Sequence, residues 1–207
     1  MSTAVSIPPD TRQIPPVPVR RFTVEEYHRL AELGIITPDE RLELIRGWLV
    51  PKVTHNPPHA GTLMILQRRL NRLLPEEWIT RAQLPVTMHD SEPEPGLVVV
   101  PGPEERYFRS HPHPRDVVLV VEVADTSLTQ DRGIKWELYA SVRIPEYWIV
   151  NLIERRVEVF TDPRGGRTPA YRRRRDFAAG ESVPVVIAGE EVGSLPVREL
   201  LPPAPES

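Results

Sequence analysis

The stretch Val117-Val-Leu-Val-Val-Glu-Val123 decides the fold of this 207-residue chain. A nearly uniform hydrophobic run with one acid in it is typical of a strand that is buried on both faces of a sheet. Because side chains alternate along a strand, Val120 and Glu122 face one side of the sheet, and Val121 and Val123 face the other. The pattern therefore places an ionisable carboxylate inside an apolar sheet.

The Glu122 carboxylate needs a physical explanation in that position. An ionised acid in an apolar strand costs several kcal/mol unless a cation or hydrogen-bond donors meet it. Different interpretations stay open: Glu122 belongs to a functional site, it lies at a strand end where it already reaches water, or it forms a structural pair with a nearby arginine.

The segments on both sides of this strand complete a mixed α/β pattern. Thr23-Val-Glu-Glu26 is a capping-box sequence, which predicts a helix that ends at Gly34. Residues 41–50 read as two short strands broken at Gly47. The other predicted elements are a helix from His59 to Pro75, strands at Trp78–Met88, Gly96–Val100, Glu146–Leu152 and Arg156–Phe160, a helix at 129–141, and a β-rich remainder with a short segment at Val197–Leu201. This order predicts a mixed central β-sheet flanked by helices.

Clusters of proline predict where the folded part begins and ends. The prolines before residue 20 predict a disordered Pro-rich arm at 1–20, because proline removes a backbone donor and fixes φ. Prolines near the other end predict a flexible tail at 202–207. Between them we expect a single domain at 21–201.

Composition excludes several classes of protein. A net charge of −3 argues against a protein that coats nucleic acid through general basicity, although it allows a local basic groove. The chain has no cysteine, which excludes disulfides and thiolate metal sites. No apolar run approaches the length of a membrane helix, and the N-terminal residues lack the layout of a secretory signal. We therefore expect a cytoplasmic location and no membrane partner.

Lys135 is the second residue that indicates chemistry. It lies on the helix predicted directly after the central strand, where its neighbour Leu138 is expected to face the sheet. Only Lys52 and Lys135 of the 26 basic residues are lysines. A desolvated ammonium can lose its proton, which a guanidinium does not do in proteins. The position favours a site that needs a compact ammonium, and the alternative is a surface lysine that buries only its stem.

Two further groups of residues carry weaker signals. His55, His59, His111 and His113 suggest a zinc site, but their spacing fits no established pattern and such histidines are usually solvated. Arg172–Arg175 suggests a phosphate contact, and a solvated strand explains the same run. The aromatic residues of the later segments are expected to pack in the core: Trp136, Tyr139, Tyr147 and Trp148.

A series of short motifs, in order along the chain, resembles one known family. The motifs are Leu42-Glu-Leu-Ile-Arg-Gly47, Asn56-Pro-Pro-His59, Ser91-Glu-Pro-Glu-Pro95, Leu119-Val-Val-Glu-Val123, Asp131-Arg-Gly-Ile-Lys135 and Ile144-Pro-Glu-Tyr-Trp-Ile-Val150. From about Arg21 to Pro163 the chain is similar to the Uma-two family of bacterial restriction-endonuclease-like proteins, within the PD-(D/E)xK nuclease superfamily. Order and spacing carry the resemblance, rather than any single motif.

The resemblance implies a restriction-endonuclease-like core and hydrolysis of phosphodiester bonds in DNA with Mg²⁺ or Mn²⁺. In such a site Glu122 and the backbone carbonyl of Val123 bind the ion, and Glu43 completes or supports the acidic cluster. Lys135 orients or deprotonates the attacking water, and Arg132 is the candidate nucleic-acid contact. Oxygen ligands suit Mg²⁺, which can activate water and neutralise charge on phosphate.

Gly96 departs from the family pattern, which has a metal-binding aspartate after Pro95. A glycine weakens a strand, so we expect no packing advantage from it. Different explanations compete: the protein is a degenerate nuclease, Glu94 substitutes in part from the same strand face about 7 Å away, or Gly96 is an individual change in an active lineage. Reduced or absent metal catalysis is the expectation for the chain as written.

The sequence thus leads to hypotheses of different classes. The first is a Mg²⁺-dependent DNA endonuclease that is impaired by Gly96. The second is a catalytically inactive nuclease-fold protein that acts as a nucleic-acid-binding or regulatory module. The third is a homo-oligomeric scaffold.

Overall fold

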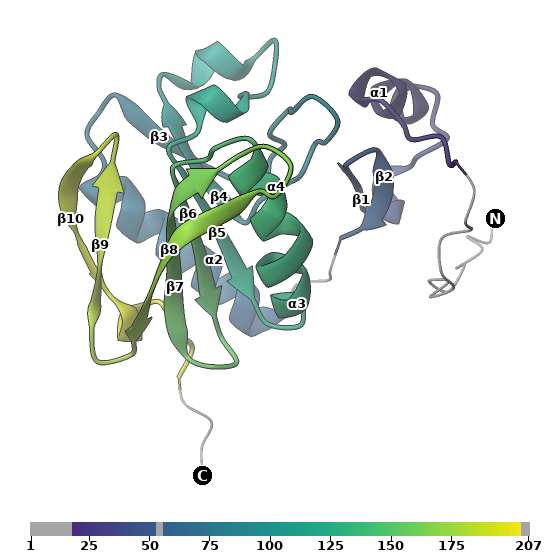
Figure 1. Cartoon of the computed structure of the whole chain (residues 1–207). Helices are drawn as coiled ribbons and strands as arrows, with labels where there is room; N and C mark the ends of the chain where they lie inside the picture. Colours follow the sequence, from purple (N-terminus) through teal and green to yellow (C-terminus); the bar gives the residue numbers. More distant parts are fainter. Residues whose placement is uncertain (1–17, 53–55, 204–207) are drawn as a thin grey trace.

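The computed structural model describes residues 18–52 and 56–203 (Figure 1). The predicted arm and tail lie almost entirely outside these residues. In the part of the chain that the structure describes, none of the helices combines the length and the apolar character needed to cross a membrane.

A six-stranded mixed sheet forms the centre of the fold, in the order β3-β4-β5-β6-β7-β8. β5 and β6 pair in parallel, and the other neighbours pair antiparallel. All six residues of β5 are buried, so the central strand predicted from the hydrophobic run is confirmed. The strands are β3 (Trp78–Ala82), β4 (Leu97–Pro101), β5 (Leu119–Ala124), β6 (Glu146–Asn151), β7 (Arg156–Arg164) and β8 (Ala170–Ala178).

Helices cover both faces of this sheet. Leucines of α2 share one core with Val121 and Val123 of β5, together with the β9–β10 hairpin. On the opposite face α4 shares a second core with Val120, as strand alternation predicts. The predicted fold class, a mixed sheet flanked by helices, is confirmed. These elements are α2 (Pro57–Leu73), α4 (Trp136–Ser141), β9 (Ser182–Ile187) and β10 (Glu190–Pro196).

The first helix and a small hairpin lie to one side of the sheet (Figure 1). α1 (Val24–Glu32) begins at the predicted capping box, in which Thr23 and Glu26 bond reciprocally at 3.1 Å. β1 (Leu42–Ile45) and β2 (Trp48–Pro51) pair antiparallel. Arg46 and Gly47 between them have φ of 50° and 78°, which matches the two-residue turn that suits strand twist. The predicted pair of strands broken at Gly47 is confirmed.

The strand predicted at Trp78–Met88 is too long. β3 ends at Ala82, because Gln83 adopts φ of 53° and Pro85, which has no N–H to donate to a ladder, follows closely. The chain then crosses to β4 as a loop.

The helix predicted at 129–141 is confirmed but is not uniform. It runs from Leu128 to Ser141, and its middle, Asp131–Lys135, is a π-helical turn between α3 (Leu128–Gln130) and α4. Such a wide turn is rare and occurs often at functional sites. Short 3₁₀ turns occupy Pro38–Glu40, Glu104–Tyr107, Pro114–Asp116 and Val197–Glu199.

Glu146 of β6 is a buried acid that lies outside the predicted site. Its residue is 7% exposed, and Trp148 Nε1 donates to its Oε1 at 2.5 Å. Burial raises the pKa of Glu146 from 4.5 to about 7. The folded state therefore holds this proton more tightly than the unfolded chain does, so the free energy of unfolding falls as pH rises between these two values.

We expect Glu146→Gln to abolish this fall in the free energy of unfolding with rising pH. At pH 5 the variant and the wild type should be similarly stable, and at pH 8 the variant should be more stable by at most about 3 kcal/mol. Urea unfolding at both pH values measures the difference. Glu158→Gln is the matched control: Glu158 is 0% exposed but meets Arg132 and Arg174, so its neutralisation should destabilise the protein at both pH values. An effect of Glu146→Gln that does not change with pH contradicts the assignment.

Candidate active site

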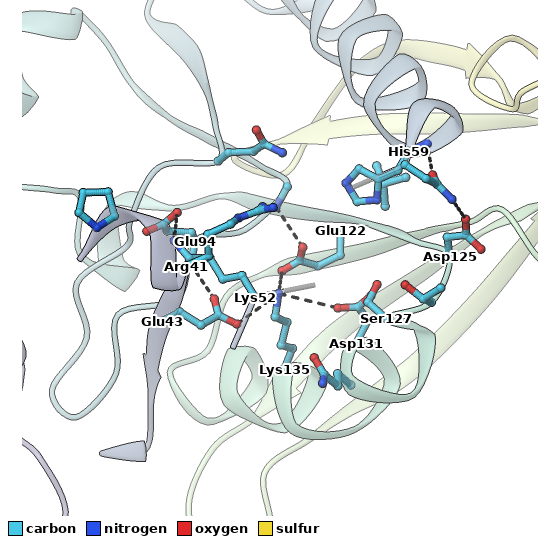
Figure 2. A pocket seen from close by; sticks show the side chains of 17 residues that line it. Arg41, Glu43, Lys52, His59, Glu94, Glu122, Asp125, Ser127, Asp131 and Lys135 are labelled. Atoms are coloured by element: carbon cyan, nitrogen blue, oxygen red, sulfur yellow. Dashed lines mark hydrogen bonds and ion pairs between the residues drawn. The ribbon is translucent and has the colours of Figure 1, made fainter. Parts of the chain in front are cut away.

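A pocket of about 350 Å³ opens where the β1–β2 hairpin, the loop before β4 and the end of β5 meet the helix that follows β5 (Figure 2). Both acidic and basic side chains line it. The acids are Glu43, Glu94, Glu122, Asp125 and Asp131, and the basic residues are Arg41, Lys52 and Lys135. Gly96 and Val123 line the same pocket, so the structure brings together every predicted catalytic and metal-binding residue.

Glu122 is buried at the centre of this group, with 5% exposure. Its Oε1 accepts from Lys135 Nζ at 3.0 Å and from the Tyr139 hydroxyl at 2.8 Å. Its Oε2 accepts from the backbone N–H of Gly96 at 3.0 Å. These donors offset the cost of burying the carboxylate. Neither the open strand end nor the arginine partner of the alternative interpretations is observed.

The Lys135 ammonium lies among acids from different parts of the chain (Figure 2). Besides Glu122, it faces Glu43 Oε1 at 3.8 Å and Asp131 Oδ1 at 3.9 Å. Burial opposes the charged form, but the negative charges of these acids outweigh it and raise the pKa of Lys135. The surroundings favour a charged lysine, so orienting water or phosphate fits Lys135 better than deprotonating water.

Asp131 is a member of this group that sequence reasoning missed. It is 1% exposed, and the Ser127 hydroxyl donates to its Oδ2 at 2.6 Å. Burial, followed by the charge of Glu122, raises its pKa from 3.8 to about 7. The available signal was the four-residue spacing to Lys135, which puts both side chains on one side of a helix.

Tyr139 has a second role beyond the predicted core packing. It is fully buried, as expected, but its hydroxyl also donates a hydrogen bond to Glu122. Tyr139 follows Lys135 by four residues, so the same helical spacing could have identified it. A buried tyrosine usually finds a partner for its hydroxyl, and here that partner is the central carboxylate.

Glu43 attaches the β1–β2 hairpin to the rest of the site. It is 3% exposed, and its Oε2 accepts from the backbone N–H of Glu94 at 3.0 Å. Burial raises the pKa of Glu43. The Glu94 carboxylate pairs with Lys52 Nζ at 2.6 Å, and Glu94 precedes β4 rather than lying within the strand as expected.

Gly96 has a packing reason, contrary to our expectation. A Cβ at this position would lie 2.9 Å from the carbonyl oxygen of Val121, closer than side chains normally approach a backbone. The start of β4 thus runs against β5 at a separation that only glycine permits. The absence of a side chain at Gly96 and the N–H bond to Glu122 belong to one local arrangement.

Arg132 is not brought to the pocket. Its guanidinium bonds Glu158 Oε2 at 3.0 Å and Glu154 Oε1 at 2.8 Å, so its charge is used in an ion-pair network beside β7. The Arg172–Arg175 run on β8 is exposed throughout, and Arg174 pairs with Asp176. Of the two interpretations of this run, the exposed strand is the one observed.

The histidines do not form a zinc site in the described residues. His111 Nδ1 meets Arg81 at 3.2 Å, and His113 Nδ1 meets the carbonyl of Thr87 at 3.0 Å. His55 lies outside the described residues. Within residues 18–52 and 56–203, no group of three His, Asp or Glu side chains is arranged to hold a metal ion.

We expect Gly96→Ala to lower the free energy of unfolding by about 1–3 kcal/mol, because the added Cβ must push two backbones apart. Gly61→Ala is the control: Gly61 lies in α2 with no atom within 4 Å of an added Cβ, so alanine should stabilise by up to about 1 kcal/mol. Urea unfolding measures both. Equal stability of Gly96→Ala and wild type would show that β4 and β5 tolerate a Cβ.

Comparisons with known proteins agree with the fold. A family model described as "Putative restriction endonuclease" matches residues 24–196. The chain is also similar to the crystal structure of a "putative nuclease belonging to DUF820" from Anabaena variabilis, with a TM-score of 0.64 and 16% identity over 86% of this chain and 97% of that one. At that identity the likeness shows the fold alone, and it agrees with a restriction-endonuclease-like core. No curated protein matched the chain. Because the family match spans most of its length, the chain belongs to the Uma2 family of restriction-endonuclease-like proteins.

Proposed function

We propose that this protein contacts DNA at the pocket and that its Mg²⁺- or Mn²⁺-dependent cleavage of phosphodiester bonds is impaired. Family membership supports an interaction with nucleic acid. One observation carries the impairment: where the family pattern has an aspartate, Gly96 has no side-chain oxygen, and only its backbone N–H reaches Glu122 Oε2, at 3.0 Å. The bond from the backbone N–H does not depend on the side chain, so the missing carboxylate is what lowers the capacity of the pocket to hold a cation.

The residues present do not fit the implied metal ion as they are arranged. Carboxylate oxygens are the ligands that Mg²⁺ prefers. Each candidate carboxylate, however, already has a partner on at least one oxygen: Glu122 meets Lys135, Glu43 meets the Glu94 N–H, and Asp131 meets Ser127 through Oδ2, whereas Asp131 Oδ1 accepts no hydrogen bond from the described residues. Of the remaining acids that line the pocket, Glu94 pairs with Lys52, and Asp125 accepts from the Asn56 side chain. We therefore derive no reaction step through a bound ion.

The chain's own residues can still meet a phosphate group. Arg41 and Lys52 are the basic residues that the β1–β2 side contributes to the pocket, and guanidinium and ammonium groups both bind phosphate oxygens. Lys135 lies deeper and stays charged, which suits an electrostatic role toward phosphate or water. These groups support DNA contact without requiring cleavage.

A second candidate function is a catalytically inactive nuclease-fold module that binds or regulates nucleic acid. The observation that favours it is that both carboxylate oxygens of Glu122 accept hydrogen bonds, which come from Lys135, Tyr139 and the Gly96 N–H. Under this alternative Glu122 stabilises the local arrangement and takes no part in chemistry.

We expect weak or no cleavage of plasmid DNA by the wild type with Mg²⁺ or Mn²⁺, and more by Gly96→Asp. Gly96→Ala is the matched control, because it adds the same Cβ without a carboxylate. Since a lost metal-site interaction typically costs tenfold or more, the aspartate variant should cleave at least roughly tenfold faster than the alanine variant. Gel assays beside a DNA-binding titration measure both properties.

The outcomes separate the candidates. Metal-dependent cleavage by the wild type that equals Gly96→Asp and is lost in Glu122→Gln contradicts the impairment. No cleavage by any folded variant, with DNA binding retained in Glu122→Ala, favours the inactive module. Folded protein that binds no DNA contradicts both. Light scattering during the titration tests self-association, which we propose as a further property.

A further inference from the structure

We infer that the ammonium of Lys135 takes the place of the divalent cation, so that the pocket carries its own built-in positive charge. This inference concerns the cation alone and does not depend on whether the chain contacts DNA. It addresses the disagreement between the metal that the family implies and the side-chain arrangement observed.

The position of the ammonium is the first argument. Lys135 Nζ lies 3.0 Å from Glu122, 3.8 Å from Glu43 and 3.9 Å from Asp131. These acids come from β1, from β5 and from the π-helical turn that also holds Lys135, so the ammonium joins the hairpin to the segment that runs from β5 into the helix. A divalent ion shared by the same carboxylates would lie close to the ammonium in a buried site, where two positive charges repel, and the chain has no carboxylate at Gly96 to offset that repulsion.

The helix geometry is the second argument. Lys135 ends the π-helical turn that Asp131 begins, and both side chains face the pocket. The lysine side chain is only 12% exposed, so its charge is directed at the acids rather than at water. The π-helical turn thus places the Asp131 carboxylate and the Lys135 ammonium in the same pocket.

The distribution of lysine is the third argument, and it is independent of the distances. The chain has 26 basic residues, and its only lysines, Lys52 and Lys135, both line this pocket. Lys52 pairs at 2.6 Å with Glu94, the acid that stands two positions before Gly96. A lysine ammonium is a compact point charge, whereas a guanidinium is a planar fork. The chain thus places both of its compact ammonium groups beside the acids of this pocket.

Lys135→Met tests the inference, because methionine keeps the length of the side chain without the charge. In EDTA the variant should unfold at a lower temperature than the wild type, since three carboxylates lose their shared cation. Adding MnCl₂ should restore much of the loss. The wild type should show no saturable Mn²⁺ effect. Titration of the Lys135→Met variant with Mn²⁺, followed by electron paramagnetic resonance, should give an affinity for Mn²⁺ on the order of tenfold or more above that of the wild type.

Lys52→Met is the matched control. It removes the other lysine of the pocket but frees only Glu94, which alone cannot hold an ion, so Mn²⁺ should not stabilise this variant. Wild-type protein that binds Mn²⁺ as tightly as Lys135→Met overturns the inference. So does a folded Lys135→Met variant that Mn²⁺ does not stabilise.

Lys135→Gln serves if the methionine variant does not fold in EDTA, because glutamine can still donate to Glu122. If neither variant folds in EDTA, refolding with MnCl₂ decides: recovery of folded protein supports the inference, and no recovery overturns it. These measurements contain no DNA. Failure of the built-in cation is therefore distinguishable from failure of the proposed function.

Discussion

The buried pair of Lys135 and Glu122 is the interaction on which the site depends. Glu122 stands in a strand whose residues are all buried, and such a carboxylate is tolerated only with donors or a cation beside it. Lys135, Tyr139 and the Gly96 N–H supply them. Removing Lys135 would leave Glu122 its other donors but no opposite charge, and a buried charge without its counter-charge is strongly destabilising.

The same pair explains why distant segments meet at this edge of the sheet. The β1–β2 hairpin is held there by the bond from the Glu94 N–H to Glu43, and by a bridge between Leu44 and Glu92. Glu43 in turn faces the Lys135 ammonium. The network around Glu158 is different, because arginines and an asparagine satisfy that acid outside the pocket. Burial of an acid alone therefore does not mark the site; convergence of acids on one ammonium does.

Membership of the Uma2 family and possession of its chemistry are separate matters, because function resides in the site and not in the fold. The chain has the central sheet, an acid in β5 and a lysine on the following helix, which are the positions that the resemblance to the family implies. It lacks the carboxylate at Gly96, where the backbones of β4 and β5 approach too closely for a Cβ. The glycine at this position is thus part of the packing between two strands.

The sequence by itself determined the features that depend on local or periodic patterns. The hydrophobic run around Glu122 fixed the central strand, the capping box at Thr23 fixed the start of α1, and Arg46–Gly47 fixed the hairpin turn, because each acts over a few neighbouring residues. The helical spacing of Lys135 and Leu138 predicted that the lysine faces the sheet, where its ammonium meets Glu122 of β5. Only the tertiary structure decided that Asp131 and Tyr139 belong to the site. It also decided that Glu94 pairs with Lys52 and that Arg132 pairs with Glu158. The close approach of Gly96 to β5 is likewise visible only in the folded chain. Those outcomes depend on distances between elements far apart in the chain, which local patterns do not encode.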